Sequence, residues 1–260
     1  MPAGIAGKVV VVTGGATGMG RVTAEEFARQ GARVVIATDA NVQGAEAVVN
    51  GIRESGGEAA FIRCNVATER DVEALVAQTV ERYGALDFAF NNAGVGPDGV
   101  RIPVVSIADC PEDIWDRTMN VNLKGVWLSM KHEIRQMVKQ GHGAIVNTAS
   151  VGALKALGGF GPYGASKSGV VALTKCAALE CARTGVRVNV ICPGPTSGTA
   201  LMENITKANP HQQEIMANLI PMGRIGDPLD VARAVIWLCS DDSSYITGHA
   251  LSIDGGQAAT

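Results

Sequence analysis

The chain has 260 residues, of which 47% are hydrophobic and 18% charged, a balance that supports a folded core and excludes intrinsic disorder. Lys and Arg total 22 against 25 Asp and Glu, so the net charge of −3 offers no basic field to nucleic acid or to an anionic membrane. The N-terminal apolar run from Val9 to Val12 is too short for a signal peptide, and no stretch of about 18 to 20 apolar residues predicts a membrane span. We therefore expect a cytoplasmic protein with neither a nucleic-acid nor a membrane partner.

Six cysteines and four histidines are scattered along the chain. No Cys-x-x-Cys pair or Cys/His cluster has the spacing of a metal site. Because no secretion signal is present, the cysteines are expected to be buried thiols rather than disulfides. The sequence therefore predicts no metal centre.

Short β-branched runs, each beginning directly after a glycine, predict six buried strands. Amphipathic stretches between them have the spacing of helices. A last helix and a last strand follow near the C-terminus. In chain order, the expected elements are strand 8–13, helix 21–30, strand 32–38, helix 41–55, strand 58–64, helix 69–83, strand 85–92, helix 112–140, strand 144–150, helix 166–184, strand 186–194, helix 228–240 and strand 249–254.

Glycine and proline mark several helix boundaries. Gly31 and Gly84 stand where a left-handed cap would end a helix, and Pro111 and Pro162 stand near helix starts. The alternation of strands and helices predicts a single α/β domain over 1–260, a doubly wound parallel sheet with helices on both faces.

The segment from about 194 to 227 fits this alternation worst, because glycines, prolines and amphipathic pieces interrupt each other there. We expect it to form a substrate-loop excursion over the carboxyl edge of the sheet, where such folds bind ligands. A tolerated surface insertion is the alternative.

The first strand runs into the glycine-rich segment TGGATGMG at 13–20, directly before a helix. Gly14, Gly18 and Gly20 would let the backbone turn tightly and approach a pyrophosphate at the helix N-terminus. No Gly-Lys-Ser/Thr follows, which excludes a Walker-type phosphate loop. A turn without a ligand remains the alternative.

Asp39 follows the second strand, roughly 20 residues beyond the glycine segment. A carboxylate there could accept both ribose hydroxyls of an adenosine and would repel a 2′-phosphate, which favours NAD over NADP. The alternative is a helix N-cap, a role that either Asp39 or Asn41 could fill.

Tyr163 and Lys167 have the i, i+4 spacing that places two side chains on one face of a helix. A tyrosine has a solution pKa of about 10, which is too high for proton transfer near neutral pH. An adjacent ammonium stabilises the phenolate and lowers that pKa, so the pair could act as general acid and base. Ser150 ends a predicted strand and could point its hydroxyl into the same pocket.

Six motifs stand in the order found in the short-chain dehydrogenase/reductase family, which the chain resembles over nearly its whole length. They are TGGATGMG at 13–20, NNAG at 91–94, NVNLKG at 120–125, Ser150, YGASK at 163–167 and NVICPG at 189–194. The resemblance implies a Rossmann-like domain, a nicotinamide cofactor, hydride transfer between alcohols and ketones, and a homotetramer.

The resemblance also implies roles for individual residues. Tyr163 resembles the catalytic acid and base, Lys167 the cation that lowers its pKa and holds the nicotinamide ribose, and Ser150 the hydroxyl that orients the substrate oxygen. Asn122 resembles the asparagine that supports a water linking Lys167 to solvent, and Asn120 is its rival. The implied cofactor contacts are Gly14, Thr17, Gly18, Met19, Gly20, Asp39, Asn65, Val66, Asn91, Ala93, Gly94, Tyr163, Lys167, Pro193, Gly194 and Thr196.

The chain departs from the family pattern at three positions. Thr38 occupies the usual place of the NAD-type acidic residue, and Asp39 comes one residue later. Asn65 replaces an aspartate on the adenine side, which keeps a hydrogen-bonding side chain. Thr199 comes one residue later than usual, so the nicotinamide contact could come from Thr196, from Thr199 or from neither.

The leading hypothesis is an oxidoreductase that transfers a hydride between NAD(H) and a small-molecule secondary alcohol or ketone. An apolar pocket walled by Leu154, Leu157, Phe160, Leu201, Met202 and Ile205 would suit a cyclic or hydrophobic substrate, although these residues could equally be core or tetramer contacts. One alternative is a 3-oxoacyl-carrier-protein reductase that uses NADPH. Another is a catalytically silent dinucleotide-binding sensor or scaffold.

Overall fold

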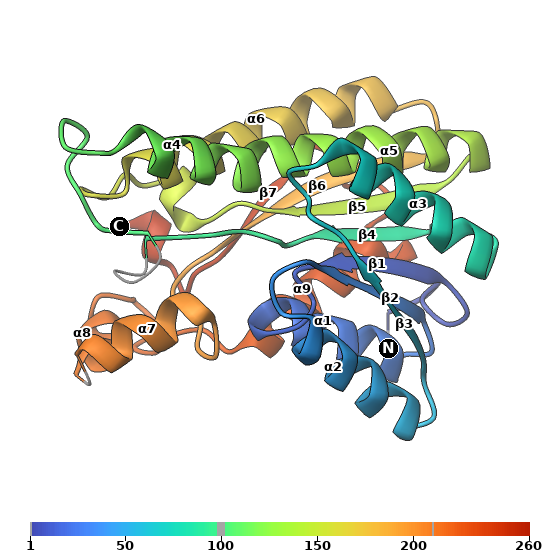
Figure 1. The fold of residues 1–260 in the computed structure, drawn as a ribbon, viewed down its shortest axis with the longest axis horizontal. Helices are drawn as coiled ribbons and strands as arrows, with labels where there is room; N and C mark the ends of the chain where they lie inside the picture. Colours follow the sequence, from blue (N-terminus) through green and yellow to red (C-terminus); the bar gives the residue numbers. More distant parts are fainter. Residues whose placement is uncertain (1, 98–101, 210) are drawn as a thin grey trace.

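A single seven-stranded parallel sheet forms the centre of the molecule (Figure 1). The computed structural model describes residues 2–97, 102–209 and 211–260. In spatial order the sheet runs β3-β2-β1-β4-β5-β6-β7, which is the doubly wound topology expected from the sequence. The strands are β1 (Val9–Thr13), β2 (Arg33–Thr38), β3 (Glu58–Arg63), β4 (Phe88–Asn91), β5 (Gly143–Thr148), β6 (Val186–Pro193) and β7 (Ala250–Ile253).

Helices cover both faces of the sheet, with α3, α5 and α6 on one side and α1, α2 and α9 on the other (Figure 1). The short helices α7 and α8 lie together beside one end of the sheet, near the C-terminus (Figure 1). The helices are α1 (Gly18–Arg29), α2 (Val42–Glu54), α3 (Glu69–Tyr83), α4 (Glu112–Met119), α5 (Gly125–Gln140), α6 (Gly161–Cys181), α7 (Ala200–Ala208), α8 (Gln212–Asn218) and α9 (Pro228–Cys239).

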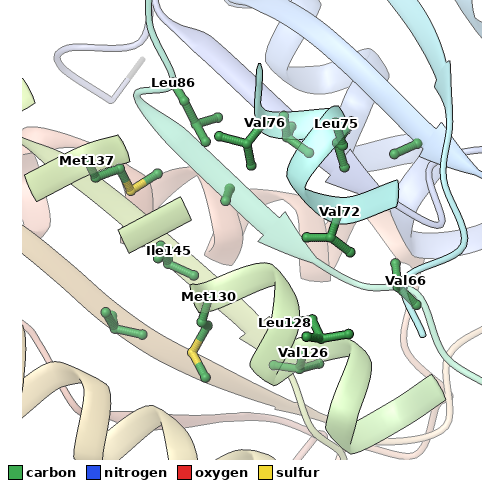
Figure 2. Close-up of a cluster of buried hydrophobic side chains, with 14 of the residues drawn as sticks. Val66, Val72, Leu75, Val76, Leu86, Val126, Leu128, Met130, Met137 and Ile145 are labelled. Carbon is green, nitrogen blue, oxygen red and sulfur yellow. The ribbon is translucent and has the colours of Figure 1, made fainter. Parts of the chain in front are cut away.

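Alternate residues of the buried strands divide the core into two layers. In β1, Val9 and Val11 pack toward α3, α5 and α6, whereas Val10 and Val12 pack toward α1, α2 and α9. Figure 2 shows part of the first layer, where apolar side chains of α3 and α5 meet above the sheet. Because both faces are covered, each strand reads as a continuous apolar run in the sequence.

The predicted helix 112–140 is interrupted in the structure. It is divided into α4 and α5 by a π-helical turn over Asn120–Lys124. Such turns occur mostly as local bulges within helices, frequently at functional sites. The fully buried Asn122 lies within this turn and bonds to a separate segment of the chain. The expected helix boundaries at Gly84 and Pro162 are confirmed, since Gly84 ends α3 in a left-handed conformation and Pro162 lies in the first turn of α6.

The six cysteines are all free thiols, with Cys176 exposed, Cys110 half-buried and the other four buried. No cluster of three or more His, Cys, Asp or Glu side chains suited to a metal ion occurs within the described ranges. Over the same ranges, no helix is long and apolar enough to cross a membrane.

Candidate active site

A large cavity of about 1300 Å³ opens at the carboxyl ends of the central strands. The sheet order reverses between β1 and β4, and a crevice at that point is the usual ligand site of a doubly wound sheet. Its walls come from the loops after β1, β2, β3, β4, β5 and β6 and from α7 and α8. The cavity is larger than the roughly 300 to 1,000 Å³ of an ordinary small-molecule pocket, so it has room for two ligands side by side.

The glycine-rich loop after β1 adopts a backbone that only glycine takes up easily. Gly14 has φ +66°, and a Cβ atom on it would lie 2.9 Å from the Cα atom of Ala93. A Cβ atom on Gly20 would lie 2.3 Å from the main-chain oxygen of Gly14. Thr17, the N-cap of α1, makes no side-chain capping bond, so the first N–H groups of that helix face the cavity end of the loop without a cap. This arrangement suits a pyrophosphate.

Asn92 fastens the glycine-rich loop to the end of β4. Its Nδ2 atom donates to the main-chain oxygens of Thr13 at 3.2 Å and Gly14 at 3.3 Å. In return, the hydroxyl of Thr13 accepts from the main-chain nitrogens of Asn92 at 3.0 Å and Ala93 at 3.1 Å. The sequence reasoning missed Asn92 as a site residue, although the Asn-Asn pair at the end of a strand was a signal for it.

Asp39 lies in the cavity wall beyond the end of β2. The helix-capping role that the sequence left open belongs to Asn41, whose side chain accepts from the main-chain nitrogen of Gly44 at 3.0 Å. The carboxylate of Asp39 makes no hydrogen bond or ion pair with the part of the chain that the structure describes. It is therefore available to a ligand.

On the adenosine side, Asn65 and Val66 also line the cavity. The side-chain oxygen of Asn65 accepts from the main-chain nitrogen of Ala67 at 2.9 Å, which leaves its amide hydrogens available. Val66 packs against Gly125, where a Cβ atom would come within 2.9 Å of it. These contacts fix the wall on which an adenine would lie.

Ser150, Tyr163 and Lys167 all face the same cavity. Ser150 follows β5 and its hydroxyl accepts from the main-chain nitrogen of Gly152 at 3.1 Å. Tyr163 and Lys167 stand one turn apart on α6, with Nζ of Lys167 5.8 Å from the centre of the Tyr163 ring. The sequence spacing therefore does bring these three side chains together.

Burial shifts the pKa values of both members of the Tyr163 and Lys167 pair. It raises the pKa of the Tyr163 phenol above its usual value of 10.0, and the Ser150 hydroxyl offsets part of that rise. Burial also lowers the pKa of Lys167 to about 8. The expected lowering of the Tyr163 pKa by Lys167 is not found: burial is the largest cause of the shift, and the opposing contribution comes from Ser150.

Asn122 is fully buried behind the cavity rather than in its wall. Its Oδ1 atom accepts from the main-chain nitrogen of Val95 at 2.8 Å, and its Nδ2 atom donates to the Val95 oxygen at 2.8 Å and to the Ser166 hydroxyl at 3.2 Å. A Cβ atom on Gly94 would lie 3.2 Å from Asn122 Oδ1 and 3.5 Å from Lys167 Nζ. The π-helical turn thus holds the segment after β4 close to the lysine. Asn120, the rival residue, lines the cavity itself.

Lys167 donates a hydrogen bond of 2.8 Å to the main-chain oxygen of Thr148, at the end of β5. An ammonium has three hydrogens, so this bond leaves two for a ligand. At the end of β6, the Thr196 hydroxyl donates to the Gly194 oxygen at 3.0 Å. The Thr199 hydroxyl donates to the Thr196 oxygen at 3.0 Å and caps α7. Both threonine hydroxyl hydrogens are therefore in use within the loop.

Most of the predicted cofactor contacts line the cavity, with two exceptions. Asn91 does not line the cavity: its Nδ2 atom donates to Glu133 at 2.8 Å and to Asn147 at 3.0 Å inside the core, so its side chain is directed away from the cavity. Gly20 lies behind Gly14 and acts through close packing. The contacts that do line the cavity are Gly14, Thr17, Gly18, Met19, Asp39, Asn65, Val66, Ala93, Gly94, Tyr163, Lys167, Pro193, Gly194 and Thr196.

The far end of the cavity is mainly apolar. All six of the residues expected to wall a pocket line it, together with Val95, Val151, Ala156, Met216 and Leu219. One polar side chain that sequence reasoning missed, Gln257, lines the cavity from the C-terminal turn. No sequence signal marks it, because it belongs to no motif and reaches the site only through the fold.

Residues 14–258 match a family model described as enoyl-(acyl carrier protein) reductase. The chain is 39% identical to a 2,5-dichloro-2,5-cyclohexadiene-1,4-diol dehydrogenase of Sphingobium indicum, with 98% of each chain covered. The chain belongs to the short-chain dehydrogenase/reductase family. As a member of that family it is an oxidoreductase that uses a nicotinamide dinucleotide, and the glycine loop, the unpartnered Asp39 and the roomy cavity fit such a cofactor.

Two further members of the family resemble this chain closely. It is 40% identical to a cyclohexanol dehydrogenase of an Acinetobacter species, over 95% of this chain and 94% of the relative. The crystal structure of levodione reductase superposes with a TM-score of 0.92 at 34% identity, covering 98% of this chain and 99% of the other. The Rossmann-like fold expected from the sequence is thereby confirmed.

Proposed function

We propose that this protein transfers a hydride between NAD(H) and a secondary alcohol or ketone carried on a ring. The proposal depends above all on one observation: Ser150, Tyr163 and Lys167 meet in a single cavity that continues past the glycine-rich loop to Asp39. When bound, NAD(H) supplies or accepts the hydride. The residues of the chain supply orientation, exclusion of water and proton transfer.

Tyr163 is the proton donor in the direction of ketone reduction. Because burial raises the pKa of its phenol, Tyr163 is protonated at neutral pH and has a proton to give to the developing alkoxide. In alcohol oxidation the same oxygen takes that proton back. The Ser150 hydroxyl accepts from the Gly152 nitrogen and is hydrogen-bonded to the Tyr163 phenol, so the two hydroxyls lie together where they can orient one substrate oxygen.

Lys167 holds a positive charge beside the phenol while one of its hydrogens is fixed on the Thr148 oxygen. Its two remaining hydrogens suit the ribose hydroxyls of the nicotinamide half. Asn122, with both of its amide atoms bonded to Val95, positions the segment after β4 against this lysine. We assign Asn122 a positioning role, since it does not touch the cavity.

We further propose that the cofactor is NAD rather than NADP. The Asp39 carboxylate has no partner in the described chain and lies in the cavity wall at the end of β2. It can accept both hydroxyls of an adenosine ribose and repels a 2′-phosphate. This charge also argues against the 3-oxoacyl-carrier-protein reductase alternative that would use NADPH.

The substrate class follows from the apolar end of the cavity and from the relatives. Leucine, phenylalanine, isoleucine and methionine side chains surround the space next to Ser150 and Tyr163. The relatives named above are a ring-diol dehydrogenase, a cyclohexanol dehydrogenase and levodione reductase. We assign the excursion between residues 194 and 227, which contributes α7 and α8, to the binding of such a ring.

A homotetramer is the proposed assembly, as the family resemblance implies. Large apolar side chains are exposed on α4, α5 and α6, including Trp115, Trp127 and Leu179, which is 81% exposed. Apolar surface of this kind suits contact with further copies of the chain. Light scattering on the purified protein tests the assembly directly.

The test of the function follows the absorbance of the reduced nicotinamide with cyclohexanol, cyclohexanone and ring diols as substrates. Tyr163→Phe should lower kcat by at least about 100-fold, the usual contribution of a general acid or base, while NAD binding by calorimetry stays nearly unchanged. Tyr245→Phe is the matched control, because Tyr245 is fully exposed at 103%. Turnover by the Tyr163 variant at the wild-type rate would contradict the proton-transfer role. Binding of NAD without turnover of any alcohol or ketone would favour the silent sensor.

A further inference from the structure

The C-terminal turn forms one wall at the apolar end of the cavity. It consists of the short 3-10 helix Gln257–Ala259. Asp254 accepts two hydrogen bonds from this turn: one carboxylate oxygen accepts from the Gly256 nitrogen at 3.0 Å and the other from the Ala258 nitrogen at 2.7 Å. Gly255 has φ +62°, and a Cβ atom there would lie 2.6 Å from Ile220. The backbone of the turn therefore lies close to Ile220.

Two contacts join this turn to the walls on either side. Nζ of Lys155, in the loop after Ser150, donates to the main-chain oxygen of Thr260 at 3.1 Å and to its hydroxyl at 3.2 Å. The Met222 nitrogen, beyond α8, donates to the Gly255 oxygen at 3.1 Å. The turn thus bridges the catalytic side of the cavity and the α7–α8 side.

Gln257 presents an amide to this end of the cavity without a partner in the protein. Its Oε1 atom is buried and accepts no hydrogen bond. That oxygen lies 3.3 Å from the position that a Cβ atom on Gly194 would occupy. Because Gly194 lies two residues before Thr196, a candidate nicotinamide contact, the amide stands at the hydride-transfer end of the cavity. Neither of its polar atoms bonds to any residue within the described ranges.

Three nearby polar side chains each have at least one partner within the chain. The Gln212 oxygen accepts from Nδ2 of Asn209 at 3.2 Å. The hydroxyls of Thr196 and Thr199 bond to main-chain atoms of their own loop. Gln257 as a whole is half-buried, but a buried amide oxygen without a partner is costly for a fold, and such exceptions call for an explanation. In an otherwise apolar compartment, a ligand atom is the natural partner.

We propose that Gln257 is a specificity-determining residue that binds a second oxygen on the ring substrate, away from the carbon that reacts at Tyr163. The inference rests on the proposed function and deepens it to ring substrates that carry two oxygens. An amide carries both a donor and an acceptor, so it serves a second hydroxyl as well as a second carbonyl. A substrate without that oxygen leaves the amide unpaired, which is how a site built for hydrogen bonding discriminates.

The experiment compares kcat/KM for cyclohexanol with kcat/KM for cyclohexane-1,2-diol, -1,3-diol and -1,4-diol. The wild type should prefer at least one diol over cyclohexanol. Gln257→Leu should lower the ratio of kcat/KM for that diol to kcat/KM for cyclohexanol by about tenfold, the effect of one net hydrogen bond. Cyclohexanol itself should be turned over as well as before or better. The matched control is Gln78→Leu, which makes the same replacement at an exposed position of α3 outside the cavity and should leave the ratio unchanged.

Gln257→Glu tests the donor and the acceptor of the amide separately. A carboxylate still accepts from a second hydroxyl but cannot donate to a second carbonyl, so this variant should lose cyclohexane-1,4-dione reduction more than diol oxidation. Because each ratio is measured within one variant, a general loss of folded protein does not alter it. An unchanged diol-to-cyclohexanol ratio in Gln257→Leu, or a wild type that prefers none of the diols, would overturn the inference. A wild type inactive on every ring alcohol and ketone would instead overturn the proposed function.

Discussion

Glu133 should make the folded protein less stable as the pH rises toward neutrality, and Glu133→Gln should remove that dependence. The side chain lies on α5 and is only 2% exposed. Its Oε2 atom accepts from Asn91 Nδ2 at 2.8 Å, and no cation pairs with it within the described ranges. Burial raises the pKa of this carboxyl from 4.5 to about 7, and the bond from Asn91 offsets only a part of that rise.

The size and sign of the effect follow from this pKa. A rise from 4.5 to about 7 is about 2.5 pKa units, and each unit corresponds to about 1.4 kcal/mol, so the full effect is about 3 kcal/mol. Folding favours the protonated acid, so this contribution is complete below pH 4.5. It declines as the pH rises from there and is lost once the pH has passed about 7.

The assay is urea unfolding of the wild type and of Glu133→Gln at several pH values between 5 and 8. Groups that the two proteins share cancel in the difference, which leaves the contribution of Glu133. The difference in unfolding free energy between the two should change by about 2 to 3 kcal/mol across the range, with the wild type losing relative to the variant. Parallel curves would refute the reasoning, because they would mean that Glu133 titrates alike in the folded and unfolded chain.

Glu26→Gln provides the control. Glu26 lies on α1, and its hydrogen bond to Arg29 lowers its pKa below 4.5. Its contribution is therefore present throughout the range from pH 5 to 8 and is lost only under more acidic conditions. The Glu26 variant should run parallel to the wild type in the same experiment.

Two further predictions concern the cofactor end of the cavity. Asp39→Ala should narrow the preference for NAD over NADP by at least about tenfold, since it removes a charge that repels the 2′-phosphate. Steady-state kinetics with both cofactors measure the ratio of kcat/KM for NAD to kcat/KM for NADP. An unchanged ratio would contradict the proposed role of the carboxylate. Gly20→Ala should weaken NAD binding and lower the unfolding free energy by about 1 to 3 kcal/mol, because the added Cβ would lie 2.3 Å from the Gly14 oxygen and 2.6 Å from Asn92. Gly51→Ala is the control for Gly20→Ala, since a Cβ atom there meets nothing within 4 Å. Calorimetric titration with NAD distinguishes the two variants. Equal NAD affinities of the two variants would contradict the packing argument.

The strands were predictable because the fold buries them on both faces. A parallel strand covered by helices has no polar face, so runs such as Val9–Thr13 stand out without any alternation. Gly84 was predictable for a related reason, since a left-handed residue with φ +82° at the end of α3 favours glycine. These features depend on local rules that hold wherever the chain folds in this way.

The break between α4 and α5 was not predictable from the same rules. Residues 120–124 have side chains that suit a continuous helix, and the bonds from Asn122 to Val95 and to Ser166, made across the fold, accompany the π-helical turn. The tertiary contact therefore decides the local geometry. A single sequence does not reveal the partner of such a contact.

The different directions of the Asn91 and Asn92 side chains have a simpler cause. Consecutive residues at the end of a strand point to opposite faces of the sheet, so Asn91 and Asn92 cannot both face the glycine-rich loop. Asn92 bonds to that loop, while Asn91 bonds to Glu133 in the core. Treating the motif as one unit concealed this alternation, although the period of two was available from the sequence.

The pKa of Tyr163 shows how burial and charge compete within one site. The sequence placed a cation one helical turn away and favoured a lower pKa, but the fold buries both groups and drives each toward its neutral form. The phenol is thereby held protonated, and Lys167, with a pKa of about 8, loses its charge at only slightly alkaline pH. In the proposed mechanism, ketone reduction starts from the protonated phenol, whereas alcohol oxidation needs the phenolate. We therefore expect reduction to be favoured at neutral pH, and oxidation to gain from a higher pH only until Lys167 is no longer charged.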